Sequence, residues 1–312
     1  MAATVVAPLL WAAGCANSKP LVLAGHPWPG YEPMFLARSM GDMPQQLTLM
    51  ESPTLQASIE AVRQGSAHGV MLTLDEILVL RAQGVPLQVV LVFDVSKGAD
   101  VLLARAAVTK LDALRGKRVG LEDTALGTLM LSMILEKAGL RQQDLTPVRI
   151  AYEEHEAAWR RGGLDALITY EPAAGRLKAA GARQLLSTRE LPDMIFDVLA
   201  VRTDIASARS DTLRDALTGH FKALTYLRQN PWDAAYRVAP RLQVTAEEMV
   251  ASLRGLELPD VLGNRRYLMN NAGHILPVVK RLSAILLQSK LIAQPVDIRN
   301  LFSDAYLPRE SA

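Results

Sequence analysis

Short apolar segments alternate with amphipathic ones along the first hundred residues. We expect strands at four apolar runs, Leu21 to Ala24, Gln46 to Met50, Gly69 to Leu72 and Leu87 to Phe93. The spacing of apolar residues between them predicts helices over Pro33 to Met40, Thr54 to Gln64 and Leu74 to Gln83. This alternation indicates a mostly parallel sheet covered by helices on both faces.

The same pattern starts again near Asp100 and gives a second unit. Its expected strands are Val101 to Ala104, Arg118 to Leu121, Val148 to Ile150, Ala166 to Thr169 and Gln184 to Leu186. Its expected helices are Thr124 to Ala138, Glu153 to Arg161 and Pro172 to Ala180. The strand Phe196 to Val201 is expected to return to the first sheet.

The rest of the chain is predicted to be helical and to pack on the first unit. These helices are Thr212 to Gln229, Pro231 to Val238, Thr245 to Gly255 and Asn271 to Ser289. The predicted fold is therefore α/β with two lobes and a helical C-terminal extension. Residues 20–98 with 202–312 form lobe 1, and residues 99–201 form lobe 2. Two crossings between the lobes leave a cleft that can close on a ligand by hinge motion.

Composition narrows the possible partners. The chain has 312 residues, half of them apolar, and 34 basic against 32 acidic residues that are mixed along the sequence. A chain of this length can bury the cores of two domains, and without a basic run it is not expected to bind nucleic acid. The single cysteine, Cys15, excludes an internal disulfide and a multi-cysteine metal site.

The segment around Cys15 resembles a bacterial lipoprotein signal. An apolar run from Val5 to Trp11 is followed by Ala12-Ala13-Gly14-Cys15 and then by polar residues up to Lys19. The resemblance implies that residues 1–19 are a signal and tether, with Cys15 lipidated and the protein anchored to the membrane in the periplasm. The alternative is an ordinary apolar N-terminus.

A rigid turn follows the first expected strand. Pro27, Pro29 and Pro33 each fix φ, and we expect Gly30 to adopt an unusual φ. The turn presents four candidate ligand contacts at the end of a strand, His26, Trp28, Tyr31 and Glu32. The alternative is a structural turn whose Trp28 fills a core.

Five motifs together resemble one family. They are Gly25 to Pro33, Leu72 to Glu76, Leu111 to Val119, Gly163 to Ala166 and Tyr170-Glu171-Pro172. In this order they resemble the nitrate, sulfonate, taurine and thiamin-pyrimidine-precursor group of ABC-transporter substrate-binding proteins. The resemblance implies a type II-like periplasmic-binding-protein fold and a monomeric receptor that delivers a small solute to a permease and ATPase. It implies no catalysis and no cofactor.

The strand ends that this family directs toward its cleft are acidic here. The candidate contacts are Thr73, Asp75, Asp94, Asp100, Glu122, Asp123, Thr124, Glu171 and Asp197. Each carboxylate could instead be a helix cap or a surface acid, and Thr124 could also be an N-cap. Several carboxylates lining one cleft repel one another unless a cation is present. We therefore expect an amine-bearing or cationic solute, with Trp28 and Tyr31 supplying stacking or cation-π contacts.

Three alternatives are weighed against this reading. Some relatives resemble pyrimidine synthases that need a cysteine-rich segment, which this chain lacks. A tethered sensor that signals to a membrane receptor would need the same binding chemistry as a transporter component. The run Glu153 to Glu156 contains His155 but is expected to be a solvated helix start rather than a metal site, because neighbouring helical residues point in different directions.

Overall fold

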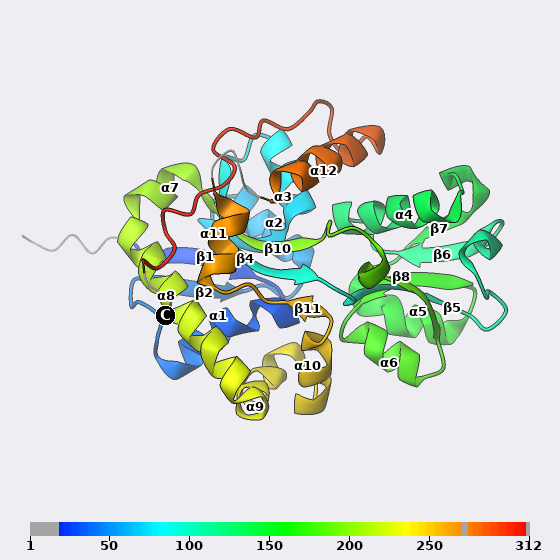
Figure 1. The fold of residues 1–312 in the computed structure, drawn as a ribbon, viewed down its shortest axis with the longest axis horizontal. Coiled ribbons are helices and arrows are strands. Elements are labelled where there is room, and N and C mark those ends of the chain that lie inside the picture. The colour runs from blue at the N-terminus through cyan, green and yellow to red at the C-terminus, as the bar shows by residue number, and fades with distance from the viewer. Residues whose placement is uncertain (1–18, 270–273, 310–312) are drawn as a thin grey trace, which may run out of the picture.

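The computed structural model describes residues 19–269 and 274–309, and it contains two sheets that form two lobes (Figure 1). The first sheet has six strands in the order β11-β4-β10-β3-β1-β2, and the second has five in the order β7-β6-β8-β5-β9. The lobe of the first sheet lies on the left of Figure 1 and that of the second on the right. The predicted two-lobe α/β architecture is confirmed.

The first sheet is built mainly from the apolar runs of the N-terminal part. Its strands are β1 (Leu21–Gly25), β2 (Leu47–Glu51), β3 (Gly69–Thr73), β4 (Leu87–Ser96), β10 (Phe196–Arg202) and β11 (Leu256–Glu257). β1 pairs in parallel with β2 and β3, and β10 lies antiparallel between β3 and β4. Strands β1 to β4 thus run in one direction, and the predicted return of β10 to this sheet is confirmed.

The second sheet repeats the arrangement with one reversed strand. Its strands are β5 (Asp100–Ala104), β6 (Arg118–Leu121), β7 (Thr146–Arg149), β8 (Ala166–Tyr170) and β9 (Arg183–Ser187). β6 is parallel to β7 and β8, whereas β5 is antiparallel to β8 and β9. The sheets are mixed by pairing, and most of their strands share one direction.

Helices cover both sheets. Those in the N-terminal and central parts are α1 (Glu32–Met40), α2 (Leu55–Arg63), α3 (Leu74–Ala82), α4 (Ala125–Ala138), α5 (His155–Arg161) and α6 (Ala173–Ala179). Short 3-10 turns are η1 (Pro29–Tyr31), η2 (Leu111–Leu114), η3 (Gln142–Asp144), η4 (Tyr152–Glu154) and η5 (Thr188–Glu190). Thr54 and Thr124 cap α2 and α4 by accepting hydrogen bonds from the backbone N-H groups of Ala57 and Gly127.

The C-terminal part is helical, as predicted, and most of it packs on the first lobe. Its helices are α7 (Thr203–Ala208), α8 (Ser210–Gln229), α9 (Pro231–Leu242), α10 (Ala246–Leu253), α11 (Val261–Leu268) and α12 (Leu276–Gln288). α8 packs against α1, and α12 packs against both α3 and α4. α12 therefore contacts both lobes, in the upper part of Figure 1.

Among the α-helices and strands of the described residues, three were not predicted, namely α7, β11 and α11. α11 depends on a tertiary contact, since the Asn264 side chain accepts a hydrogen bond from the backbone N-H of Val92 at 2.7 Å and donates to the Val92 carbonyl at 3.1 Å. α9 also continues past the predicted end at Val238 to Leu242, with Pro240 inside the helix. The predicted start of the last helix, Asn271, lies outside the described residues, and the helix begins at Leu276.

The two crossings between the lobes are bonded to each other. The first crossing links β4 to β5 and the second links β9 to β10. The hydroxyl groups of Ser96 and Thr188 lie 2.8 Å apart, and the backbone N-H of Gly98 donates to Thr188 Oγ1 at 2.7 Å. The Lys97 N-H also donates to the Gly255 carbonyl at 2.8 Å. The two segments that connect the lobes are therefore hydrogen-bonded to each other.

Gly219→Ala tests the contact between α8 and the turn that follows α1. A Cβ at Gly219 would lie 2.3 Å from the Asp42 carbonyl oxygen, a backbone atom that cannot move alone. Alanine normally stabilises a helix interior, but overpacking costs about 1–3 kcal/mol, so we expect a lower free energy of unfolding in urea.

The matched control is Gly175→Ala in α6. There the nearest atom to the added Cβ is the movable end of the Glu171 side chain, at 2.9 Å. The control is expected to change the unfolding free energy much less. Equal stability of the two variants would contradict the close packing of α8.

Candidate functional site

A pocket of about 290 Å³ lies between the two lobes. Its lobe 1 residues come from the β1 turn, the start of α2 and the end of α9, and its lobe 2 residues come from the end of β6, from η4, from the end of β8 and from α5 and α6. The lining residues are His26, Pro27, Pro53, Thr54, Leu55, Glu122, Tyr152, Glu153, Glu156, Tyr170, Pro172, Ala173, Arg176, Arg241, Leu242 and Gln243. Its volume is close to the lower limit for small-molecule sites, about 300 Å³.

Aromatic rings form one wall of this pocket. The rings of Tyr152 and Tyr170 are stacked, with centroids 4.2 Å apart and an interplanar angle of 1°. Trp28 meets Tyr170 edge to face, with centroids 5.6 Å apart. Trp28 does not line this pocket, but its contact with Tyr170 connects the stacked pair of lobe 2 to the β1 turn of lobe 1.

Acidic side chains lie beside the aromatic wall. The Tyr170 hydroxyl donates to Glu122 Oε2 at 3.3 Å. Burial, together with the nearby charge of Glu153, raises the pKa of Glu122 to about 7. Glu122 thus gains from any cationic group that approaches it.

Both arginines of the pocket are engaged by carboxylates. Arg241 forms an ion pair with the buried Glu32, approaches Glu51 at 3.4 Å and lies over the Phe35 ring at 3.4 Å. Glu32 therefore holds Arg241 in place from behind the pocket.

Arg176 of α6 is held in the same way. Its guanidinium contacts Glu248 at 2.7 Å and Glu156 at 3.3 Å. Because Glu248 belongs to α10, this ion pair also joins lobe 2 to lobe 1.

A smaller cavity of about 20 Å³ lies deeper between the lobes. It is lined by His26, Trp28, Leu55, Thr73, Asp100, Leu126, Tyr170, Ile195 and Asp197. Among the described residues, no partner is found for His26 Nδ1, Thr73 Oγ1 or Asp100 Oδ2. The cavity has room for about one water-sized group with two to four polar contacts.

Two carboxyl groups line this cavity, those of Asp100 and Asp197, and that of Asp94 lies behind it. Asp100 begins β5 of lobe 2, whereas Asp94 and Asp197 belong to β4 and β10 of lobe 1. Burial raises the pKa of Asp100 to about 7 and that of Asp197 to about 8. Burial also raises the pKa of Asp94 well above its usual value, and the charge of Asp197 adds to that effect.

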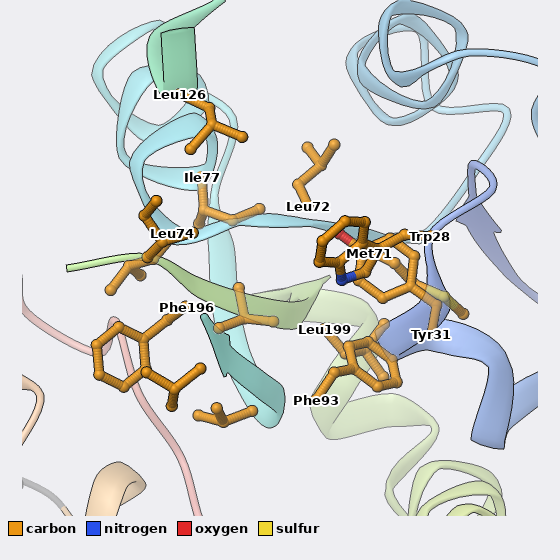
Figure 2. Close-up of a cluster of buried hydrophobic side chains, with 14 of the residues drawn as sticks. Trp28, Tyr31, Met71, Leu72, Leu74, Ile77, Phe93, Leu126, Phe196 and Leu199 are labelled. Atoms are coloured by element: carbon orange, nitrogen blue, oxygen red, sulfur yellow. The ribbon is translucent and has the colours of Figure 1, made fainter. Parts of the chain in front are cut away.

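Two aromatic residues of the β1 turn donate hydrogen bonds to Asp94 and Asp197. Trp28 Nε1 donates to Asp94 Oδ2 at 3.0 Å, and the Tyr31 hydroxyl donates to Asp197 Oδ1 at 2.5 Å. Figure 2 shows Tyr31 in the buried cluster, where its ring centroid lies 5.1 Å from that of Phe93. Gly30 has no positive φ, contrary to our expectation; glycine is needed because a Cβ would lie 1.7 Å from Asp94 Oδ2.

The predicted contacts divide into three groups. Those that line one of the two cavities just described are His26, Trp28, Thr73, Asp100, Glu122 and Asp197. Those buried behind these cavities are Tyr31, Glu32, Asp75 and Asp94. Asp123 and Thr124 line a separate pocket beside α2 and α3, and Glu171 lines another between α6 and α10. Tyr31 is fully buried and Glu32 pairs with Arg241, so both support the wall rather than line it.

The third group is directed away by local interactions. Asp123 has an 81 % exposed side chain near Arg149, and Thr124 is the N-cap of α4. Glu171 accepts from the Gly175 N-H at 2.9 Å and pairs with Lys178 at 3.0 Å, so it serves the first turn of α6. For these three positions the structure favours the alternative role as cap or surface acid.

Sequence reasoning missed four residues that line the larger pocket, Tyr152, Tyr170, Arg176 and Arg241. Tyr170 stands in the quoted motif Tyr170-Glu171-Pro172 and could have been found there, since it precedes Glu171 at the end of β8. Arg241 and Arg176 carried no local signal, because they reach the pocket from helices far along the chain. His155 is fully buried and bonded to Thr169 at 3.0 Å, so the predicted solvated helix start is wrong there.

Two further searches cover the described part of the chain. No group of three or more His, Cys, Asp or Glu side chains there is placed to hold a metal ion. None of the helices in residues 19–269 and 274–309 combines the length and apolar character needed to cross a bilayer. Cys15 and its expected lipidation lie outside the described residues.

The buried acids predict a fall in stability between about pH 6.5 and pH 8. In this range a carboxyl such as Asp197, with a folded pKa of about 8 against 3.8, binds protons in the native state that the unfolded chain has lost, so unfolding becomes easier as pH rises. The buried histidines His26 and His220, whose pKa burial lowers to about 3, act in the opposite direction near the lower end of this range, because their unfolded imidazoles still lose protons around pH 6.5.

Thermal unfolding across this range is the measurement. Asp197→Asn should flatten the fall, whereas Asp211→Asn, at a side chain 92 % exposed, should leave it unchanged. A melting temperature that rises from pH 6.5 to pH 8 in the parent chain would show that the acids are not buried as described.

Comparison with solved structures supports the fold. The aliphatic sulphonate binding protein SsuA of Escherichia coli superposes with a TM-score of 0.76 over 92 % of this chain and 99 % of its own, at 19 % identity. SsuA of Xanthomonas axonopodis pv. citri, bound to MOPS, gives 0.71 over 95 % and 100 %, also at 19 % identity. The desulfurization enzyme DSZB gives 0.69 over 91 % and 97 %, at 17 % identity.

Comparison of the sequence itself gives the family. No curated protein matches the chain. A family model described as NMT1/THI5 like matches residues 46–234, which is more than half of the chain and includes β2 to β10 with the greater part of both sheets. The chain therefore belongs to the NMT1/THI5-like family, as the motifs indicated.

Proposed function

We propose that this protein is an extracytoplasmic receptor that captures a small solute between its lobes and delivers it to an ABC permease and ATPase. The observation that carries the proposal is the pocket of about 290 Å³ lined from both lobes, beside a connection made of two tied crossings. Such a geometry lets one ligand hold two lobes together. Membership of the NMT1/THI5-like family agrees with this role.

The bounds of the lobes follow the sheets in this proposal. The boundary expected at residues 201–202 would assign β10 to lobe 2, whereas β10 pairs with β3 and β4 of the first sheet. We therefore place lobe 2 at residues 99–195 and lobe 1 at residues 20–98 with 196–312.

We further propose that the solute bears an amine or another cationic group. The two arginines that line the pocket are paired with carboxylates of this chain, while Glu122, Asp100 and Asp197 line the two cavities. The stacked tyrosines give a face for an aromatic or cationic group. The two SsuA proteins are described as binding sulfonates, so this chain would differ from them in the charge of its solute.

The roles of individual residues follow from their positions. The cationic nitrogen would be received by the Asp100 and Asp197 carboxylates with Thr73, and the body of the solute would lie against Tyr152 and Tyr170. His26 borders both cavities, and its neutral imidazole would accept or donate one hydrogen bond to the solute.

Attachment and partners are proposals of the same kind. We propose that Cys15 carries a lipid that anchors a monomeric receptor to the membrane in the periplasm. A sensor that reports to a membrane receptor would bind its solute in the same way. The enzyme DSZB shares this fold, so the fold alone does not separate binding from catalysis; the pairing of the pocket's cations and the aromatic wall support binding.

Titration calorimetry with a panel of primary amines, aminopyrimidines, sulfonates and nitrate tests the solute class, and native mass spectrometry of the purified protein identifies any retained solute. We expect binding to amines and aminopyrimidines. Binding to sulfonates or nitrate alone would refute the cationic solute but leave the receptor function standing.

Two variants test the pocket with the best ligand of that panel. Tyr152→Ala removes half of the aromatic stack and Glu122→Gln removes an acid, so we expect each to weaken binding by about tenfold, the effect of roughly 1.4 kcal/mol. The control is Glu154→Gln, an exposed acid next to the pocket that does not line it. Equal loss in the control would show that the ligand binds elsewhere.

A further inference from the structure

The smaller cavity between the lobes is bordered by polar atoms that lack partners. Its volume of about 20 Å³ gives room for one water-sized group but not for a group of several heavy atoms. Three atoms of its lining residues have no hydrogen-bond partner among the described residues, namely His26 Nδ1, Thr73 Oγ1 and Asp100 Oδ2. The three residues are at most 9 % exposed, so a bound group rather than bulk water has to satisfy these atoms.

All three atoms can accept a hydrogen bond. The Asp100 oxygen accepts when the carboxyl group is ionised. Burial and the charge of Arg241 lower the pKa of His26 to about 3, so its imidazole is neutral near pH 7 and one of its ring nitrogens accepts. Burial raises the pKa of Asp75 and interaction with the Thr73 hydroxyl lowers it in part. A hydroxyl hydrogen directed to Asp75 leaves the lone pairs of Thr73 Oγ1 free to accept.

A primary ammonium group has the size, the donors and the charge that this cavity requires. It is one heavy atom with three N-H donors, which equals the number of unpartnered acceptors. Methylation replaces these donors with carbon atoms that need more space. Water has a similar size but only two donors and no charge, whereas the carboxyl groups of Asp100 and Asp197 both line the cavity.

The larger pocket has the place for the rest of such a solute. His26, Leu55 and Tyr170 line both cavities, so a ligand that fills both passes between these three side chains. On the side of the larger pocket the ring of Tyr170 is stacked on that of Tyr152. The passage leads to a solute with a slim aminoalkyl arm on a body that lies against the stacked rings.

We propose that the smaller cavity selects a primary ammonium group, which donates to His26, Thr73 and Asp100 while the body of the solute lies in the larger pocket. This inference rests on the proposed solute-binding function and narrows it from cations in general to N-unsubstituted amines. Guanidinium groups and methylated amines carry the same charge but are excluded by their size.

Titration calorimetry of the purified full chain with benzylamine and with benzyltrimethylammonium tests this selection. The two cations share one ring and one charge and differ only at the nitrogen. We expect the parent chain to bind benzylamine at least about tenfold more tightly, because the methylated nitrogen has no N-H donor and does not fit. Leu126→Ala enlarges the smaller cavity and should reduce this preference, since the added space admits methyl groups.

A second variant removes an acceptor from the cavity. Thr73→Val nearly keeps the shape of the side chain but loses the hydroxyl, so benzylamine should bind about tenfold more weakly. Thr48→Val is the matched control, because Thr48 is an exposed residue of β2 that lines neither cavity. Circular dichroism reports whether each variant is folded, and Leu126→Val replaces Leu126→Ala if that variant unfolds.

The proposal is overturned if the parent chain binds benzyltrimethylammonium as tightly as benzylamine, or if Thr73→Val binds benzylamine as well as Thr48→Val does. Either result leaves the receptor and its cationic solute standing, because the nitrogen then lies in the larger pocket and the smaller cavity holds a water molecule only. Binding of neither cation refutes the cationic solute and this inference with it. The two failures are therefore distinguishable.

Discussion

The burial of carboxyl groups at the boundary between two lobes is the constraint on which the rest of the site depends. Asp94, Asp100 and Asp197 come from three strands and are each at most 3 % exposed. Uncompensated charges in such a place are costly, so each must be protonated, hydrogen-bonded or paired. The indole of Trp28 and the phenol of Tyr31 supply donors to two of them, which gives the Pro-rich turn after β1 its structural purpose.

Compensation also explains the positions of the basic residues. Arg241 forms an ion pair with the buried Glu32, and its guanidinium group lies over the Phe35 ring. Its charge is therefore paired within the protein. Arg176 is similarly committed to Glu248 and Glu156. Both arginines of the pocket are thus paired within the protein, whereas Asp94 Oδ1 and Asp100 Oδ2 have no hydrogen-bond partner among the described residues.

Much of the fold could be predicted from the sequence because the signals were local. The apolar run of β4 and the cap at Thr124 are examples, and the reversed strand β10 was recognised from its position after the second unit. α11 could not be recognised in this way, because its Asn264 is satisfied by the backbone of β4, far away in the chain.

For the candidate site, the position of a residue at a strand end was enough to predict that it lies near the lobe boundary, and Asp100, Glu122 and Asp197 line cavities there. The direction of a side chain was less predictable. The Glu171 side chain accepts a hydrogen bond from the Gly175 N-H, and the Tyr31 hydroxyl donates to the buried Asp197. Both orientations depend on partners that are positioned only in the folded chain. Arg241 and Tyr152 come from segments that no motif marked.

The hydrogen bond between Ser96 and Thr188 has a consequence for the way a bound group can act on the lobes. The hydroxyl groups of Ser96 and Thr188 join the two connections at one point between the lobes. Asp100 begins β5 directly after the first connection and Asp197 lies near the start of β10 after the second, and both line the same small cavity. A group that binds these two acids therefore acts at the joint between the lobes, where a small change in their relative orientation moves the rest of each lobe most.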